Sequence, residues 1–157
     1  KRLPKKEQKI IQYCHEIDAT DSKVYQDAVA SYYAKHVCRN KSASRRMEKI
    51  KNETGKLIYQ HMWGASEFSA TGNLKGYDGV NKLQNIKIPT LFLCGEYDEA
   101  RPSTIRRYAK LVRASRFYEI KNTSHAILAE NSRLMIKKIR CFLKDVESED
   151  FCQSRRN

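Results

Sequence analysis

The segment Ile86 to Pro102, which reads IKIPTLFLCGEYDEARP, predicts how the second half of the chain folds. Five apolar or β-prone residues, Thr90 to Cys94, stand between a proline and a glycine and so indicate a short buried strand. Asp98 and Glu99 follow in the next turn. Because ligands of open parallel sheets bind beyond the carboxyl ends of the strands, these acids are the first candidates for a functional site. The alternative is that they cap the helix expected after them.

The sequence after this segment predicts a helix, a second strand and a second helix. Pro102 or Ser103 is expected to begin the first helix, since apolar residues recur there at helical spacing and proline suits a first helical turn. Residues 116–121 alternate in the manner of a strand, residues 122–125 form a polar turn, and residues 130–146 fit a helix. The order strand, helix, strand, helix implies a parallel pair of strands.

The first half of the chain has no strand pattern and is expected to be helical. Apolar residues recur every three or four positions over 5–17 and from Val24 to about residue 39. The polar residues 40–44 are expected to form a loop, and 46–60 to be helical in part, with Gly55 dividing them.

A different composition follows in residues 61–78, which read HMWGASEFSATGNLKGYD. They hold three glycines and the only tryptophan of the chain, without a clear period. We expect an ordered loop here, in which Trp63 and Phe68 bury apolar area, and then a short helix over 80–86.

Length and charge restrict the class of protein. The chain has 157 residues, consistent with one domain, and a formal net charge of +13. Such an excess could attract nucleic acid, but the lysines and arginines are dispersed, and no helix-turn-helix, zinc-finger or RNP pattern occurs. A basic nucleic-acid-binding module therefore remains an alternative that only the charge supports.

The cysteines and the apolar runs restrict the compartment. Five widely spaced cysteines without a CxxC pair argue against a disulfide framework or a zinc site and favour reduced thiols in the cytosol. No apolar run approaches the length of a membrane span, and no secretory signal opens the sequence. A cytoplasmic protein without a cofactor or metal is expected.

A histidine offers a partner for the acids. His125 follows the second expected strand, and parallel strands end at the same edge of a sheet, so His125 and Asp98 can meet there. An acid bonded to one imidazole nitrogen fixes the tautomer, and the other nitrogen can then act as a general base. This Asp…His order matches the last two members of the Ser…Asp…His order of α/β-hydrolases. The alternative for His125 is a polar surface residue in a turn.

Several motifs together resemble the C-terminal half of the proline iminopeptidases (prolyl aminopeptidases), a branch of the α/β-hydrolase fold. The similarity extends from about Ser31 to Leu143. The motifs that carry it are HVCR (36–39), MWGASEF (62–68), TGNLKGYD (71–78), IPTLFLCGEYDEARP (88–102) and TSH (123–125) with Glu130 after it.

The resemblance implies an α/β fold, namely the C-terminal portion of an α/β-hydrolase. Its parts would be a helical lid region (1–60), a lid-to-core segment (61–87), the last two parallel strands with their helices (88–146) and a charged tail (147–157). The enzyme implied is a serine hydrolase that releases N-terminal proline from peptides.

The resemblance also implies roles for single residues. Asp98 would be the acid of the catalytic triad and His125 its base. Glu67 and Glu99 resemble the two carboxylates that bind the free α-ammonium group of the substrate. Phe68 or Trp63 could form an apolar wall for the prolyl ring. The alternatives are a capping Glu99, a solvated Glu67 and a structural Trp63.

One part of the family pattern is missing from this sequence. No G-x-S-x-G elbow occurs, and the nearest segment, GASEF (64–68), lacks the last glycine. The motifs present correspond to the lid and the last two strands, so we expect the chain to be inactive alone and to need an N-terminal half of the hydrolase as partner. The alternatives are a non-catalytic remnant or binding domain, and another α/β-hydrolase activity on esters or amides.

Overall fold

The computed structural model describes residues 2–53, 55–64, 68 and 70–148, and the chain folds as two compact units. The helical unit comprises Lys1–Lys35 and Lys41–Tyr77, and the sheet unit comprises His36–Asn40 and Asp78–Asn157.

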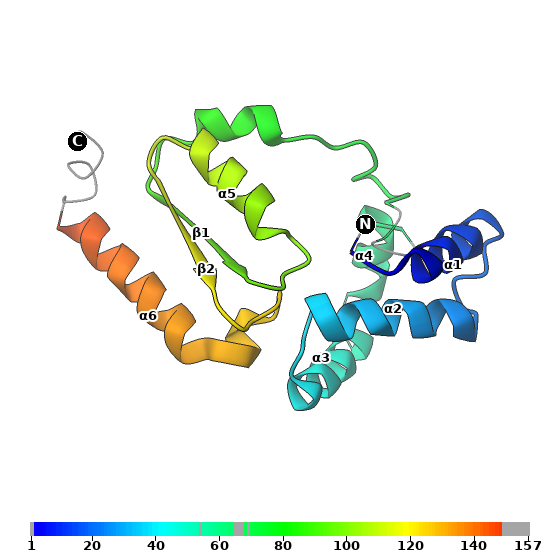
Figure 1. The fold of residues 1–157 in the computed structure, drawn as a ribbon. Coiled ribbons are helices and arrows are strands. Elements are labelled where there is room, and N and C mark those ends of the chain that lie inside the picture. The colour runs from blue at the N-terminus through cyan, green and yellow to red at the C-terminus, as the bar shows by residue number, and fades with distance from the viewer. Residues whose placement is uncertain (1, 54, 65–67, 69, 149–157) are drawn as a thin grey trace. The chain divides into compact units, whose positions relative to one another are not determined.

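Four helices make up the regular structure of the helical unit (Figure 1) within the described residues. They are α1 (Lys5–Glu16), α2 (Lys23–His36, with its last residue in the sheet unit), α3 (Lys41–Glu53) and α4 (Lys56–Met62). Gly55 separates α3 from α4, as predicted, with a φ of 61° in the left-handed region that favours glycine.

The loop expected over residues 40–44 is wrong, because α3 begins at Lys41. The polar composition of residues 40–44 is typical of a loop, but it also suits the exposed first turn of a helix. Ala43, only 2% exposed, is the one buried contact in this turn, and Arg46 donates a hydrogen bond to the Ser42 hydroxyl one turn earlier. The expected loop over 61–78 holds for its described residues after Met62, where α4 ends.

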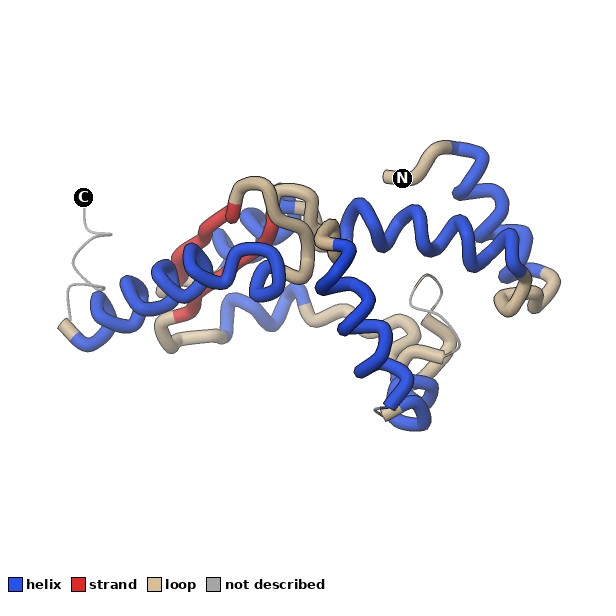
Figure 2. The backbone as a smooth tube through the Cα atoms, turned by 90° about the horizontal axis from the view of Figure 1, so that it is seen from below, coloured by secondary structure: helices blue, strands red, loops and turns tan. Residues whose placement is uncertain are grey.

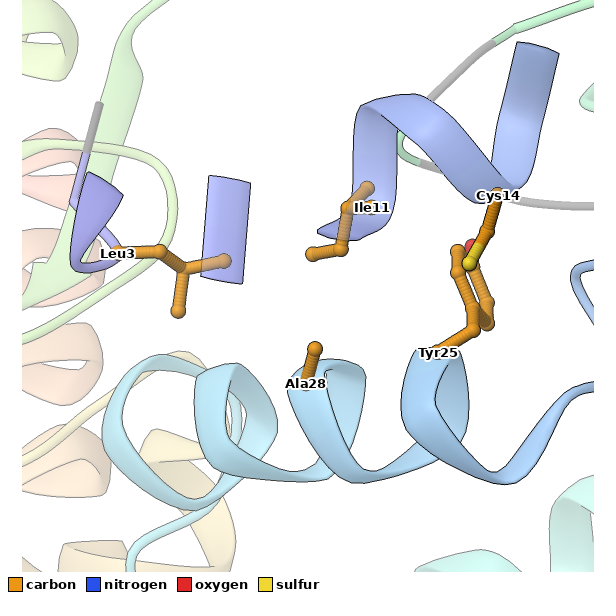
Figure 3. Close-up of a cluster of buried hydrophobic side chains, with 5 residues drawn as sticks. All are labelled: Leu3, Ile11, Cys14, Tyr25 and Ala28. Carbon is orange, nitrogen blue, oxygen red and sulfur yellow. The ribbon is translucent and has the colours of Figure 1, made fainter. Parts of the chain in front are cut away.

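The core of the helical unit lies between α1 and α2. Figure 3 shows side chains from the two helices facing each other, and the cluster consists of Leu3, Ile11, Cys14, Tyr25 and Ala28. The cluster follows the helical spacing of apolar residues in both segments, so burial of these faces is the expected driving force for pairing the two helices.

The sheet unit is built on two parallel strands, β1 (Thr90–Gly95) and β2 (Ser115–Ile120), in the register Thr90↔Ser115 to Gly95↔Ile120. The parallel pair is therefore confirmed. The short helix η1 (Val80–Asn85) precedes β1, α5 (Pro102–Leu111) connects the strands, and α6 (Ile127–Glu147) follows β2. Figures 1 and 2 show α5 and α6 on opposite sides of the two strands.

The start of α5 and the interruption of α6 both lie close to the ends of the strands. Pro102 is the first residue of α5, as predicted, and no side chain caps this helix, so the capping alternative for Asp98 and Glu99 is wrong. Helix α6 is interrupted at Asn131, whose φ of −152° and ψ of 62° are not helical. The Asn131 side chain accepts a hydrogen bond from the Leu134 N–H at 3.2 Å and so caps the longer, second part of α6.

Candidate active site

The ends of the two strands bring Asp98 and His125 together. Asp98 follows β1 by three residues and His125 follows β2 by five, and the last residues of the strands are register partners. The Asp98 Oδ1 lies 3.0 Å from the His125 Nδ1. The pairing expected from the strand order is therefore present, and the catalytic role of the pair stays a prediction.

Gly95 allows the two strand-end turns to touch. A Cβ atom at Gly95 would lie 2.3 Å from the Ser124 carbonyl oxygen and 2.5 Å from that of Thr123. The Tyr97 N–H donates to the same Thr123 oxygen at 2.9 Å. Glycine is required here because only a residue without Cβ lets the backbone before His125 approach the end of β1 so closely.

Asp98 is held rigidly and is only 3% exposed. Its Oδ2 accepts a hydrogen bond from the Gly95 N–H at 3.2 Å, and its Oδ1 accepts one from the Ala100 N–H at 2.9 Å. Since an ionised carboxylate can only accept, the contact with Asp98 is a hydrogen bond when the Nδ1 of His125 carries the proton. The Nε2 lone pair is then available to take a proton.

His125 presents this second nitrogen at the surface of the sheet unit. Its side chain is 53% exposed, and its Nε2 lies 3.8 Å from the Glu99 Oε1. The Glu99 side chain is 27% exposed, so a carboxylate stands beside the nitrogen that would act as the base. This distance exceeds a normal hydrogen bond, so the two groups are close without being directly bonded.

A remote segment, His36–Asn40, which we call the strap, connects the two turns. The His36 carbonyl oxygen accepts hydrogen bonds from the Glu99 N–H at 3.2 Å and from the His125 N–H at 3.1 Å. The Val37 carbonyl oxygen accepts one from the Ala126 N–H at 2.8 Å. Sequence reasoning missed this role, and the only available signal was the resemblance of HVCR to a family motif.

Side chains of the strap add to these bonds. The His36 Nδ1 lies 2.7 Å from the Tyr97 carbonyl oxygen, and the Arg39 guanidinium lies 3.9 Å from the centre of the Tyr97 ring. The strap therefore holds the turn after β1 both by hydrogen bonds and by a cation–π contact.

The other candidate residues do not lie in the sheet unit. Glu67 lies outside the described residues. Phe68 belongs to the helical unit and packs edge-on against Tyr32, with ring centres 5.2 Å apart. Trp63 follows the last residue of α4 and is 38% exposed. Within the sheet unit, the structure brings together the candidates Asp98, Glu99 and His125.

Among the described residues, the surroundings of the site hold neither a candidate metal cluster nor an activated thiol. In the described part of the chain, no group of three or more His, Cys, Asp or Glu side chains could hold a metal ion. Burial, with the nearby charge of Asp98, raises the pKa of the Cys94 thiol to about 11, which makes this cysteine a poor nucleophile near neutral pH.

No helix among the described residues is long and apolar enough to cross a membrane.

The fold and the position of the pair define a class of protein. An acid after one parallel strand and a histidine after the next match the last two triad positions of an α/β-hydrolase. The crystal structure of a proline iminopeptidase from Mycobacterium smegmatis covers 95% of this chain with a TM-score of 0.79 at 23% identity. The crystal structure of VinJ covers 91% with a TM-score of 0.72 at 29% identity. The chain has the fold of the C-terminal half of an α/β-hydrolase.

Within that class, the chain is similar to the C-terminal half of the proline iminopeptidases, and the resemblance seen in the motifs is confirmed. Proline iminopeptidase of Heyndrickxia coagulans is 33% identical over 147 residues, which are 93% of this chain and 51% of the relative. The enzyme of Saccharolobus solfataricus is 29% identical over 147 residues, 93% of this chain and 47% of the relative. No family model matches the chain.

The chain spans about half the length of the curated relatives it matches. The two solved structures show the same ratio, since the chain covers 50% of the M. smegmatis protein and 49% of VinJ. The similarity supports a chain of the α/β-hydrolase type that corresponds to the C-terminal half of these relatives.

Proposed function

We propose that this chain supplies the acid and base of a proline iminopeptidase, which removes an N-terminal proline from peptides. The observation that carries this proposal is the 3.0 Å contact between a buried Asp98 and the half-exposed His125 at the ends of adjacent parallel strands. Asp98 holds the imidazole and stabilises its charged form, and His125 takes the proton of a serine nucleophile and returns it to the leaving amine. No cofactor takes part.

Glu99 is proposed to select substrates with a free N-terminus. Its carboxylate lies 3.8 Å from the nitrogen of His125 that would face the scissile bond. An α-ammonium group bound by Glu99 would therefore lie on the same residue as the reacting carbonyl, with only the Cα between them, as an aminopeptidase requires. From the family resemblance, Glu67, Trp63 and Phe68 are proposed to complete the ammonium site and the prolyl pocket.

The nucleophile is proposed to come from an N-terminal half that also extends the sheet. Among the described residues the sheet has only β1 and β2, and parallel strands are normally buried between neighbours. The same half would carry the G-x-S-x-G elbow and the oxyanion-stabilising backbone groups. By itself the chain is expected to be inactive.

The test is hydrolysis of a prolyl arylamide by the 157-residue chain, alone and after addition of the N-terminal half of the H. coagulans relative. Activity is expected only in the mixture, and it should be lost on His125→Ala. Glu99→Gln should reduce the preference for prolyl over N-acetyl-prolyl arylamide, whereas Glu147→Gln, at the end of α6, should not.

Three outcomes would redirect the proposal. An assembled but inactive mixture would indicate a non-catalytic remnant. Hydrolysis of simple esters with no preference for proline would indicate a different α/β-hydrolase activity. Retention of the free-N-terminus preference in Glu99→Gln would remove Glu99 from the ammonium site.

A further inference from the structure

The Glu130 carboxylate collects hydrogen bonds from two segments that are far apart in sequence. Its Oε2 accepts one from the Ser124 N–H at 2.5 Å, in the turn that carries His125. Its Oε1 accepts one from the Asn40 N–H at 3.3 Å and another from the Arg39 N–H, both in the strap. The Ser124 hydroxyl adds a further donor to Oε1 at 2.9 Å.

Burial of Ser124 makes its bonds to Glu130 hard to replace by water, whereas the two bonds from the strap are exposed. Ser124 is fully buried and Thr123 is 1% exposed, so the turn before His125 has little access to solvent. The Ser124 hydroxyl also lies 3.0 Å from the Val37 carbonyl oxygen and has a single proton to share between the strap and Glu130. Loss of the carboxylate would therefore remove the acceptor of a buried N–H beside His125, which is costly.

The local structure of α6 explains how a helix residue reaches both segments. Glu130 lies in the first turn of α6, where the helix dipole favours a negative charge. Asn131 then leaves the helical conformation and caps the remaining part of α6. The interruption separates the turn with Glu130 from the long helix, so its carboxylate can be directed by the strap and by Ser124.

A neighbouring carboxylate shows that this arrangement is specific. Glu96 also accepts a backbone hydrogen bond from the turn after β2, from the Asn122 N–H at 3.0 Å, but its side chain is otherwise bonded to the exposed Lys121 ammonium group at 3.3 Å. Of the two acids, Glu130 is the one that joins the His125 turn to the strap. The strap in turn accepts the His125 N–H through the His36 carbonyl oxygen.

We propose that Glu130 is a positioning residue for the general base: by joining the strap to the His125 turn, its carboxylate holds the imidazole in the Nδ1–H form that faces Asp98. The inference rests on the proposed function for its kinetic consequence only. Glu130 does not touch the reacting atoms. It acts on them through Ser124 and through the strap. Removal of the carboxylate should therefore alter the tautomer of the His125 ring more than the stability of the fold.

The first test measures the His125 tautomer in the 157-residue chain by long-range ¹H–¹⁵N NMR, at a pH where the ring is neutral. The wild-type chain should show the Nδ1–H form. Glu130→Gln keeps the size of the side chain but places an NH₂ group among N–H donors, and it should shift the ring toward the Nε2–H form that imidazole prefers in water. Ser124→Ala, which removes one donor, should shift it less in the same direction.

Asp145→Asn is the matched control. Asp145 lies further along α6 and forms an ion pair with Arg116 of β2, so its loss weakens packing of the same helix without touching the strap. Circular dichroism should show all three variants folded. A folded Glu130→Gln with the wild-type tautomer would overturn the proposal, and if that variant fails to fold, an unchanged tautomer in Ser124→Ala would do the same.

The second test uses the mixture with the N-terminal half. Glu130→Gln should lower kcat by about tenfold to a hundredfold, the scale expected from a small misplacement of a catalytic group, with KM changed by less than about twofold. A wild-type mixture without activity would refute the proposed function but leave the tautomer result valid. A variant with wild-type kcat in an active mixture would refute the positioning role.

Discussion

Replacing Gly95 with alanine should separate Asp98 from His125, because the end of β1 and the turn before His125 touch at this residue. The added Cβ would lie 2.3 Å from the Ser124 carbonyl oxygen, and both of its nearest neighbours are backbone atoms. Cβ atoms essentially never approach other heavy atoms within 3.0 Å. The turn must therefore move away by at least about 0.7 Å, since close-packed backbone offers no free space.

This displacement acts directly on the distance between acid and base. Ser124 precedes His125, whereas Asp98 is anchored to β1 by the Gly95 N–H. The Asp98 Oδ1 and the His125 Nδ1 are 3.0 Å apart. A shift of this size away from Asp98 would separate the two atoms beyond the usual range of a hydrogen bond. We expect a loss of about 1–3 kcal/mol in the free energy of unfolding, as is typical of overpacking.

Urea unfolding followed by circular dichroism measures the stability, and the NMR tautomer of His125 measures the geometry. Gly76→Ala is the control: its φ of 74° costs about 1–2 kcal/mol for a residue with Cβ, but nothing lies within 4 Å of the new atom. Only the Gly95 variant should change the tautomer. A Gly95→Ala chain with wild-type stability and tautomer would refute the argument that the two turns are in contact.

Two further predictions concern titratable groups. The pKa of Glu96 is lowered, first by the hydrogen bond from the Asn122 N–H and then by Lys121. A carboxyl group with a depressed pKa stabilises the fold above its unfolded pKa and ceases to do so as the pH falls through its folded pKa. The urea midpoint of the wild type should therefore exceed that of Glu96→Gln at pH 6 and converge with it below pH 4.5, and a constant difference would contradict this. For Cys94, whose pKa is about 11, iodoacetamide at pH 8 should leave the native thiol unlabelled while it alkylates the exposed Cys141, as peptide mass spectrometry can show. Labelling of Cys94 at the rate of Cys141 would mean that the strand is not buried.

Much of the sheet unit could be predicted because its signals are local. A proline and a glycine bound the apolar run of β1, and alternation identifies β2. Parallel strands end at one edge, so the juxtaposition of Asp98 and His125 followed from topology alone. Helix α3 was predicted to begin later than it does, because a polar first turn and a polar loop have the same composition.

The contacts that the strap and Glu130 make could not be predicted, for a physical reason. The strap is bound mainly through backbone N–H and carbonyl groups, which every residue has, so the residue types carry little information about it. About ninety residues separate Arg39 from Glu130, and no periodic pattern extends over such a distance.

The sequence by itself determined the elements and the candidate acid and base, because hydrophobic periodicity, proline and glycine act over a few residues. Only the tertiary structure decided which backbone groups hold that acid and base in place. Gly95 permits the close approach of two turns, and Glu130 joins the His125 turn to a strap from the first third of the chain. These contacts depend on the folding of distant segments into one unit, which is information that local sequence does not contain.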